Sequence, residues 1–181
     1  PINDIEVIET ELMLSDLETL NKRKNSIEKK VRAGDKEAKL IFEIILKVID
    51  QLEDGKPARE INFSKDDFFI VKKLNLLTFK PVLFVANVDE ESSVDGNDYS
   101  HELTKLGASK GIKTITMSAK LESEISEISN IEERNEFLIA LNLVESGLEK
   151  LAKAGYDLLD LVTYFTAGPK EVRAWTIKKG S

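Results

Sequence analysis

The chain has 181 residues, of which 41% are hydrophobic and 33% are charged, and its formal net charge is −7. Such a chain can bury a core and suits one or two domains, and its net charge argues against uniform adhesion to nucleic acid. The lack of cysteine excludes disulfides, thiolate metal sites and a cysteine nucleophile, and a single histidine excludes a metal cage built from histidines. No apolar run approaches the ~20 residues that span a membrane, so we expect a cytoplasmic protein.

Residues 4–32 are predicted to form one long helix, because apolar residues recur at helical spacing from Met13 to Val31. In the sequence RAGDKE that follows, Gly34 suits the left-handed end of this helix and Asp35 suits the cap of a second one. The second helix carries a stripe of five apolar residues, namely Ala38, Ile41, Ile45, Val48 and Leu52. Two matched stripes joined by a short turn predict an antiparallel, coiled-coil-like hairpin within residues 1–60.

Residues 61–158 alternate predicted helices and strands. Ser64 is expected to cap a helix whose Phe68, Val71 and Leu74 share one face. A strand at 82–86 is followed by a helix in DYSHELTKLGASKG, which should end between Gly107 and Gly111. A second strand, in IKTITMSAK, should end at Ser118. Apolar strands separated by a helix predict part of a parallel sheet covered on both faces, in an α/β domain.

The C-terminal part begins with two predicted helices. The first has Asn130 as its cap, and Gly155 is the expected end of the second. Residues 159–181 then change character, because they are rich in β-branched and aromatic residues around a turn at Gly168 and Pro169. This stretch is predicted to form a β-hairpin.

Polar residues follow both predicted strands of the α/β region. The strand in KPVLFVANVDE ends at Asn87, and the next strand ends at Ser118. In open α/β sheets, ligands bind beyond the carboxyl ends of the strands, so both positions are candidates for a binding site. Alternatively, Asn87 and Ser118 have only a structural role, because polar residues often end a strand or begin a helix. The residues alone leave both the binding and the structural interpretation open.

The sequences NVDE and SAK at these strand ends resemble the two base-recognition elements of P-loop GTPases, which are usually Asn-Lys-x-Asp and Ser-Ala-Lys. Here Glu90 stands in the place of the Asp, and Val88 stands in the place of the Lys that packs over the base. The variant Asn-x-x-Glu, the long hairpin before it and TYFTAGPKEVRAWTI after it together resemble the YchF family, an Obg-related branch of P-loop NTPases. The resemblance runs along all 181 residues.

Membership of this family implies a nucleotide-binding ATPase or GTPase that favours or tolerates ATP. The resemblance assigns base binding to six residues: Asn87, Val88, Glu90, Ser118, Ala119 and Lys120. It also implies three parts: the helical hairpin at 1–60, the second half of the G domain at 61–158, and the start of a β-grasp (TGS) domain at 159–181.

The sequence contains no Gly-x-x-x-x-Gly-Lys-Ser/Thr motif, which would cradle phosphates and supply a hydroxyl to Mg²⁺. We therefore expect an internal fragment of a longer protein, with ATP or GTP and Mg²⁺ bound in the full-length protein and neither bound tightly by this piece. No catalytic residue is predicted. The acidic run from Asp89 to Glu91 is expected to be a solvated loop rather than a metal site, because consecutive carboxylates point in different directions.

The remaining polar residues suggest no acid–base chemistry. His101 is expected on the surface of its helix, and the carboxylates of LESEISEIS and EERNE are expected to form solvated helix faces.

The end of the helical hairpin carries a second functional signal. Residues 22–32 hold six Lys or Arg against one Glu, and Lys36 and Lys39 follow. A basic tip on an acidic protein is typical of proteins that contact phosphate backbones. Long helices also carry lysine on their solvent-exposed face for solubility, so this structural explanation stays open. The family implies ribosome or RNA association, so the alternative function is a ribosome- or RNA-interaction module that does not hydrolyse nucleotide. The candidate contacts are Lys22, Arg23, Lys24, Lys29, Lys30 and Arg32.

Overall fold

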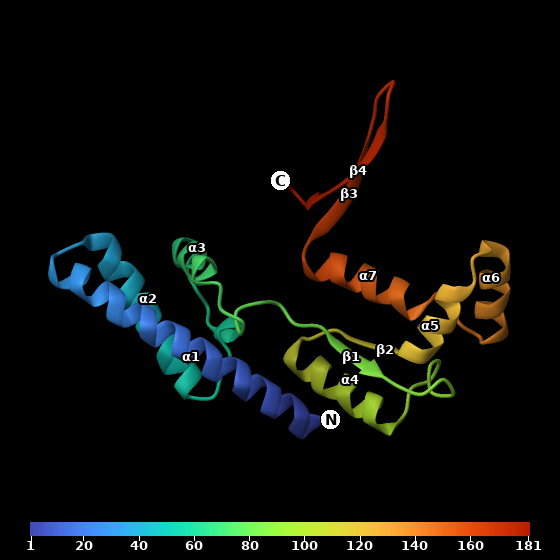
Figure 1. Ribbon diagram of the computed structural model, residues 1–181. Coiled ribbons are helices and arrows are strands. Elements are labelled where there is room, and N and C mark those ends of the chain that lie inside the picture. Colours follow the sequence, from blue (N-terminus) through green and yellow to red (C-terminus); the bar gives the residue numbers. More distant parts are fainter. The chain divides into compact units, whose positions relative to one another are not determined.

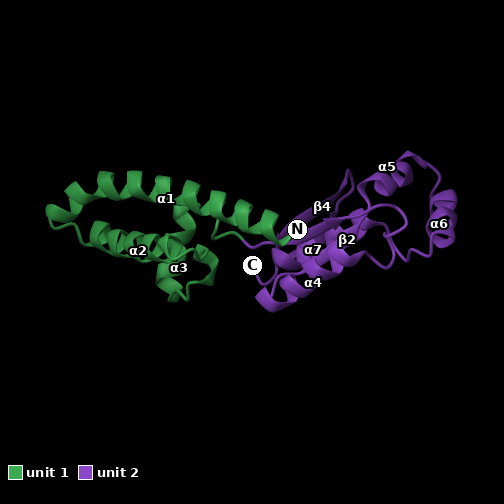
Figure 2. Ribbon diagram, turned by 90° about the horizontal axis from the view of Figure 1, so that it is seen from below, with its two compact units in different colours: residues 1–80 green, residues 81–181 purple.

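The computed structural model describes all residues from Pro1 to Ser181, and they form two compact units, residues 1–80 and 81–181 (Figures 1 and 2). Unit 1 is helical, whereas unit 2 combines helices with two small sheets. The chain is therefore an α/β protein, as predicted at this coarse level. None of its helices combines the length and apolar character that a membrane span requires. The three-part division at residues 60 and 158 stays a prediction.

Unit 1 is organised around the predicted helical hairpin. Helices α1 (Ile2–Arg32) and α2 (Lys36–Glu53) lie side by side in both overall views (Figures 1 and 2). The turn between them has the predicted chemistry. Gly34 has φ of 86°, and the Asp35 carboxylate accepts hydrogen bonds from the backbone N–H groups of Glu37 and Ala38 at 3.0 Å each. The cap satisfies amides that the first turn of a helix leaves unpaired.

The core of unit 1 forms where the apolar stripes of the two helices meet. Leu20 of α1 and Ile45 and Val48 of α2 are completely buried. Helix α3 (Lys65–Leu74) begins at Ser64, whose hydroxyl accepts from the Asp67 N–H at 3.1 Å, and it adds Val71 to the same core. Segment 58–80 thus packs on the hairpin through its apolar side chains.

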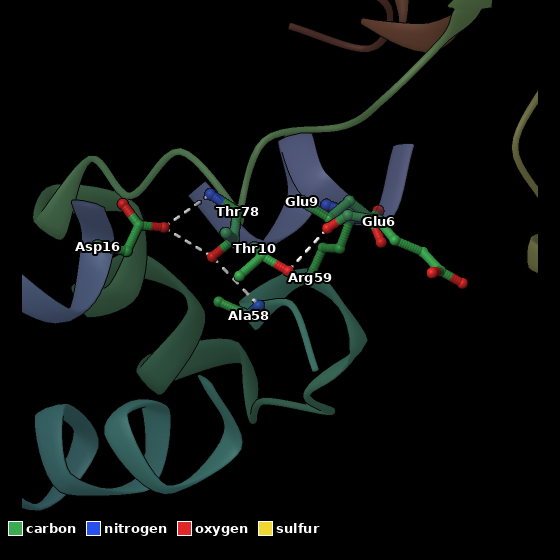
Figure 3. Close-up of polar contacts among 7 residues, drawn as sticks. All are labelled: Glu6, Glu9, Thr10, Asp16, Ala58, Arg59 and Thr78. Atoms are coloured by element: carbon green, nitrogen blue, oxygen red, sulfur yellow. Dashed lines mark hydrogen bonds and ion pairs between the residues drawn. The ribbon is translucent and has the colours of Figure 1, made fainter. Parts of the chain in front are cut away.

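A buried carboxylate ties α1 to the end of unit 1. Asp16 is only 3% exposed, and it accepts a hydrogen bond from the Leu77 N–H at 2.8 Å. It also accepts from the Thr78 N–H at 2.8 Å and the Thr78 hydroxyl at 2.7 Å (Figure 3). The Thr78 hydroxyl in turn accepts from the Ala58 N–H at 3.3 Å. A buried charge is tolerated when such bonds replace its water, and here every donor lies on the segment that leads into unit 2. We call Asp16, Ala58 and Thr78 the Asp16 clasp.

An ion pair reinforces the same region. The guanidinium of Arg59, in the short helix η1 (Ala58–Glu60), pairs with Glu9 of α1, and both side chains are more than four-fifths buried. The Arg59 N–H also donates to the Thr78 carbonyl at 3.1 Å. Helix α1, η1 and residues 77–78 are therefore held together by polar contacts beside the apolar core (Figure 3).

Unit 2 contains the predicted parallel strands. Strands β1 (Phe84–Asn87) and β2 (Thr114–Met117) pair in parallel, with Phe84 opposite Thr114 and Asn87 opposite Met117. Helix α4 (Asp98–Lys110) connects them and ends at Gly111, which has φ of 66°. This is the right order for two neighbouring strands of an α/β sheet, and their carboxyl ends lie together.

Helices cover both faces of β2. A Cβ on Gly107 of α4 would lie 2.4 Å from the Thr114 hydroxyl oxygen, and a Cβ on Gly147 of α7 (Gly147–Leu158) would lie 2.6 Å from the Met117 Cβ. Thr114 and Met117 are three residues apart on one strand, so their side chains point to opposite faces. The close approach of each helix depends on its glycine. The predicted coverage of both faces is confirmed at β2 but not at β1, where Val85 is 42% exposed.

The helices after β2 confirm one predicted boundary and correct another. Helix α5 (Ala119–Glu127) starts directly after the strand, and α6 (Ile131–Ala140) begins at Asn130, whose side chain accepts from the Glu132 N–H as predicted. The predicted end of a helix at Gly155 is wrong, because α7 continues to Leu158. Glycine weakens a helix interior by only about 1 kcal/mol, and the Gly155 carbonyl still accepts from the Leu159 N–H at 3.1 Å.

The chain ends in the predicted β-hairpin. Strands β3 (Leu161–Ala167) and β4 (Val172–Lys178) are antiparallel, and Tyr164 lies opposite Trp175. The Gly168 N–H donates to the Glu171 carbonyl at 2.9 Å and closes the turn. Whether this hairpin begins a TGS domain stays a prediction.

Candidate functional site

The structure brings together all six residues assigned to base binding. They lie on two segments, the loop after β1 and the start of α5, at the carboxyl ends of the parallel strands. We call them the strand-end cluster, which consists of Asn87, Val88, Glu90, Ser118, Ala119 and Lys120.

Asn87 forms the first link between the two segments. Its side-chain oxygen accepts a hydrogen bond from the Ala119 N–H at 2.9 Å. The next residue extends the strand pairing, since the Val88 N–H donates to the Met117 carbonyl at 2.9 Å. Asn87 therefore fixes the start of α5 against the end of β1, and its amide group keeps two N–H donors for other partners.

Glu90 forms the second link. Its carboxylate makes an ion pair with the Lys120 ammonium, in which the Lys120 side chain is 75% exposed and that of Glu90 is 41% exposed. The hydrogen bond and the charge of Glu90 raise the pKa of Lys120, and the charge of Glu124 adds to the effect. Lys120 is therefore a full cation at neutral pH, and the acid of NVDE is paired with the lysine of SAK.

Ser118 and the loop residues keep these links in place. The buried Ser118 side chain caps α5 by accepting from the Leu121 N–H at 3.5 Å. In the loop, Asp89 accepts from the Ser92 N–H at 2.8 Å, and the Ser93 N–H donates to the Glu90 carbonyl at 3.1 Å. The hydrogen bonds from Ser92 lower the pKa of Asp89. Asp89 therefore stabilises a turn that directs Glu90, rather than Asp89, toward Lys120.

The strand-end cluster contains several groups that can form hydrogen bonds. It offers amide donors, backbone carbonyls and an exposed carboxylate–ammonium pair beside a helix N-terminus, where partial positive charge gathers. The side chains of the whole structure include no group of three or more His, Cys, Asp or Glu placed to hold a metal ion. Such an arrangement suits hydrogen bonding to the edge of a planar ligand.

Comparison with known proteins identifies relatives of this chain. No family model matches the chain. The ribosome-binding ATPase YchF of Bacillus subtilis is 47% identical over 182 residues, which cover 99% of this chain and 50% of the relative. The protein of the same name from Escherichia coli O157:H7 is 41% identical over 100% of this chain and 49% of its own length.

A solved structure is similar to the same part of the family. The Schizosaccharomyces pombe YchF GTPase matches the fold with a TM-score of 0.86 at 33% identity, over 100% of this chain and 50% of its own. The chain belongs to the YchF family. It spans about half the length of the curated relatives that it matches.

Beside this YchF strand-end cluster, Glu122 corrects an expectation. The carboxylates of LESEISEIS were expected to form a solvated face, yet Glu122 is only 6% exposed. It accepts hydrogen bonds from the N–H groups of Gly147 at 2.6 Å and Leu148 at 3.0 Å, which are the first two residues of α7. A carboxylate is favourable at a helix N-terminus, so Glu122 joins α5 to α7.

The basic tip of the YchF hairpin is only partly free of ion pairs. Lys22 pairs with Glu18 at 2.6 Å and Arg32 with Glu28 at 2.7 Å, each along α1. The other four candidate contacts, which have no ion-pair partner, are Arg23, Lys24, Lys29 and Lys30. All but the half-buried Lys24 are exposed. Acids along α1 therefore pair with two of the six cations, and four positive charges at the tip remain without an ion-pair partner.

Sequence interpretation missed two buried carboxylates, Asp16 and Glu122. For Asp16 a signal was present, because it lies three residues after Met13 and four before Leu20, within the apolar stripe of α1. An acid at a core position of a helix requires buried hydrogen-bond donors. Glu122 follows Leu121 and precedes Ile125, so its burial has no comparable signal in the spacing.

Proposed function

We propose that this chain supplies the base-recognition part of a nucleotide-binding ATPase or GTPase of the YchF type, in which ATP binds at least as well as GTP. The observation that carries this proposal is the hydrogen bond from the Ala119 N–H to Asn87, which joins the NVDE and SAK segments into one site. Relatives named ribosome-binding ATPase and a structure named YchF GTPase support the reaction class.

The strand-end cluster fits the base of a nucleotide rather than its phosphates. The Val88 carbonyl would accept from the amino group of adenine, while Asn87 braces the loop. The 181 residues hold no Gly-x-x-x-x-Gly-Lys-Ser/Thr sequence, so other residues of the full-length protein would hold the phosphates and Mg²⁺. This chain is accordingly proposed to bind nucleotide weakly when it is alone.

Competition between ATP and GTP for the full-length protein that contains this chain tests the proposal. We expect ATP to compete at least as well as GTP. A GTP preference of about a hundredfold or more, equivalent to roughly 2.7 kcal/mol, would contradict the proposed base tolerance, and failure to bind either nucleotide would contradict the proposed function.

A second function rests on the basic tip. We propose that it contacts the phosphate backbone of RNA, with the ribosome as the partner, because four cations without ion-pair partners gather at the end of the hairpin of an otherwise acidic chain. The names of the bacterial relatives support a ribosomal partner. Such a partner agrees with the cytoplasmic location that the composition favours. The full-length protein would combine both functions, whereas this chain alone would have only the second.

A further inference from the structure

The YchF-type acid Glu90 is already paired, because one oxygen of its carboxylate contacts the Lys120 ammonium. We propose that Lys120 is a specificity-determining positioning residue: by holding one oxygen of the Glu90 carboxylate in an ion pair, it weakens the acceptor that would select guanine. The base is then contacted mainly through backbone groups. This inference rests on the proposed nucleotide function. It explains the proposed tolerance of adenine by the contact between two residues, Glu90 and Lys120.

Both members of the pair are fixed by the backbone around them. Lys120 directly follows Ala119, whose N–H is held by Asn87 at 2.9 Å. Glu90 lies in a turn closed by the bond between the Ser92 N–H and Asp89 at 2.8 Å. Neither residue needs a rearrangement of its segment to reach the other. The ion pair is therefore present in the site before any ligand binds.

The hydrogen-bonding edges of the two purines respond differently to this pair. Guanine presents two neighbouring N–H donors, which a free carboxylate accepts together, whereas adenine presents one amino donor beside a ring nitrogen with a lone pair. A free carboxylate would attract the guanine edge and repel the lone pair of adenine. When the ammonium of Lys120 occupies the carboxylate, both the attraction and the repulsion decrease. The pair thus lowers discrimination between the bases.

The size of the effect follows from the exposure of the pair. With side chains 75% and 41% exposed, water and salt screen the interaction. Guanine must compete with Lys120 for the Glu90 carboxylate. Loss of an exposed ion pair of this kind should change the ratio of GTP to ATP affinity about twofold to fivefold. Lys120 is therefore expected to adjust base preference rather than to reverse it.

Equilibrium competition between ATP and GTP in the full-length protein tests the inference. Lys120→Met keeps the apolar stem and removes the charge, so the ratio of GTP to ATP affinity should rise about twofold to fivefold. Lys120→Arg keeps the charge and should keep the wild-type ratio. In the Lys120→Met protein, adding Glu90→Gln should abolish the gain, because the freed carboxylate is then gone. Lys105→Met, which changes an exposed lysine on α4, serves as the matched control.

The outcomes separate this inference from the function on which it rests. If the wild-type protein binds neither nucleotide, the proposed function fails. If it binds ATP and Lys120→Met leaves the ratio unchanged, the inference is overturned while the function stands. An equal loss of affinity for both nucleotides would likewise overturn it, because Lys120 would then support the fold of the loop without affecting base choice.

Discussion

The side-chain oxygen of Asn87 accepts the N–H of Ala119 at 2.9 Å, although the two residues are 32 positions apart in the chain. Parallel pairing of β1 and β2 brings them together, because it places the ends of both strands at one edge. The Asn87 side chain thus helps to fix the loop after β1 against the first turn of α5.

Replacing Asn87 by alanine should weaken nucleotide binding by the full-length protein about tenfold, roughly 1.4 kcal/mol, since the loop loses its link to α5. ATP affinity measures the effect, and hydrogen exchange at the Ala119 amide should become faster in the same variant. Asn97→Ala, which removes the cap of α4 at the other end of the loop, is the control for general loosening. Unchanged exchange at Ala119 would show that the Asn87 contact is not formed in solution.

Shortening Glu90 to aspartate should move base preference toward GTP. The shorter side chain reaches Lys120 less well, and it reproduces the acid of guanine-specific P-loop GTPases. We expect the GTP-to-ATP affinity ratio to rise by about twofold to tenfold in competition measurements on the full-length protein. An unchanged ratio would mean that Glu90 has no influence on base choice, and a ratio that falls would contradict the predicted direction.

Reversing three charges at the hairpin tip, in the variant Lys29→Glu, Lys30→Glu and Arg32→Glu, should reduce ribosome or RNA binding. Each phosphate contact that is lost should reduce the slope of log K against log salt by roughly 0.7 to 0.9. All three positions are exposed and glutamate is a good helix former, so helicity by circular dichroism should be retained.

The matched control for the hairpin tip reverses three exposed lysines on α3 of the same unit, Lys65, Lys72 and Lys73. It makes the same change in net charge away from the tip. Equal losses of binding in the two triple variants would assign the effect to overall charge, and no loss in either would reduce the basic tip to a solvated face.

Removing the Asp16 carboxylate should destabilise unit 1. Asp16→Ala leaves the N–H groups of Leu77 and Thr78 without their acceptor, at a cost of about 2–4 kcal/mol. Urea unfolding and faster hydrogen exchange of residues 76–80 measure the effect. Asp50→Ala, at an exposed position of α2, should be close to neutral. Equal stability of the two variants would contradict the role of the Asp16 clasp.

Glu122→Ala should loosen the contact between α5 and α7 by about 1–3 kcal/mol, because the first two amides of α7 lose their acceptor. Glu127→Ala, which changes an exposed acid at the end of α5, is the matched control. Hydrogen exchange at Gly147 and Leu148 reports the change directly. Protection that survives in Glu122→Ala would show that other groups cap α7.

Local chemistry in the sequence was enough to predict the hairpin and most helix starts. Gly34, Asp35, Ser64 and Asn130 each act within a few residues of their own position, and the structure confirms all four. Gly155 failed as a helix end because a single glycine is a weak breaker when neighbouring helix bonds persist.

The position of the candidate site could be predicted from the sequence, but the contacts between its side chains could not. The resemblance of NVDE and SAK to known elements pointed to six residues, whereas the pairing of Glu90 with Lys120 depends on how the loop turns at Asp89 and Ser92. Asp16 and Glu122 accept donors 61 and 25 positions away in the chain, and no local pattern specifies such partners.

The Asp16 clasp also imposes an order of events on a chain that grows from its N-terminus. Helix α1 leaves the ribosome before its buried carboxylate has a partner, and the Thr78 donors emerge 62 residues later. Until then the Asp16 carboxylate must remain hydrated, because burying a charge without hydrogen-bond partners is costly. Completion of unit 1 during synthesis therefore waits for the segment that leads directly into the strand bearing Asn87.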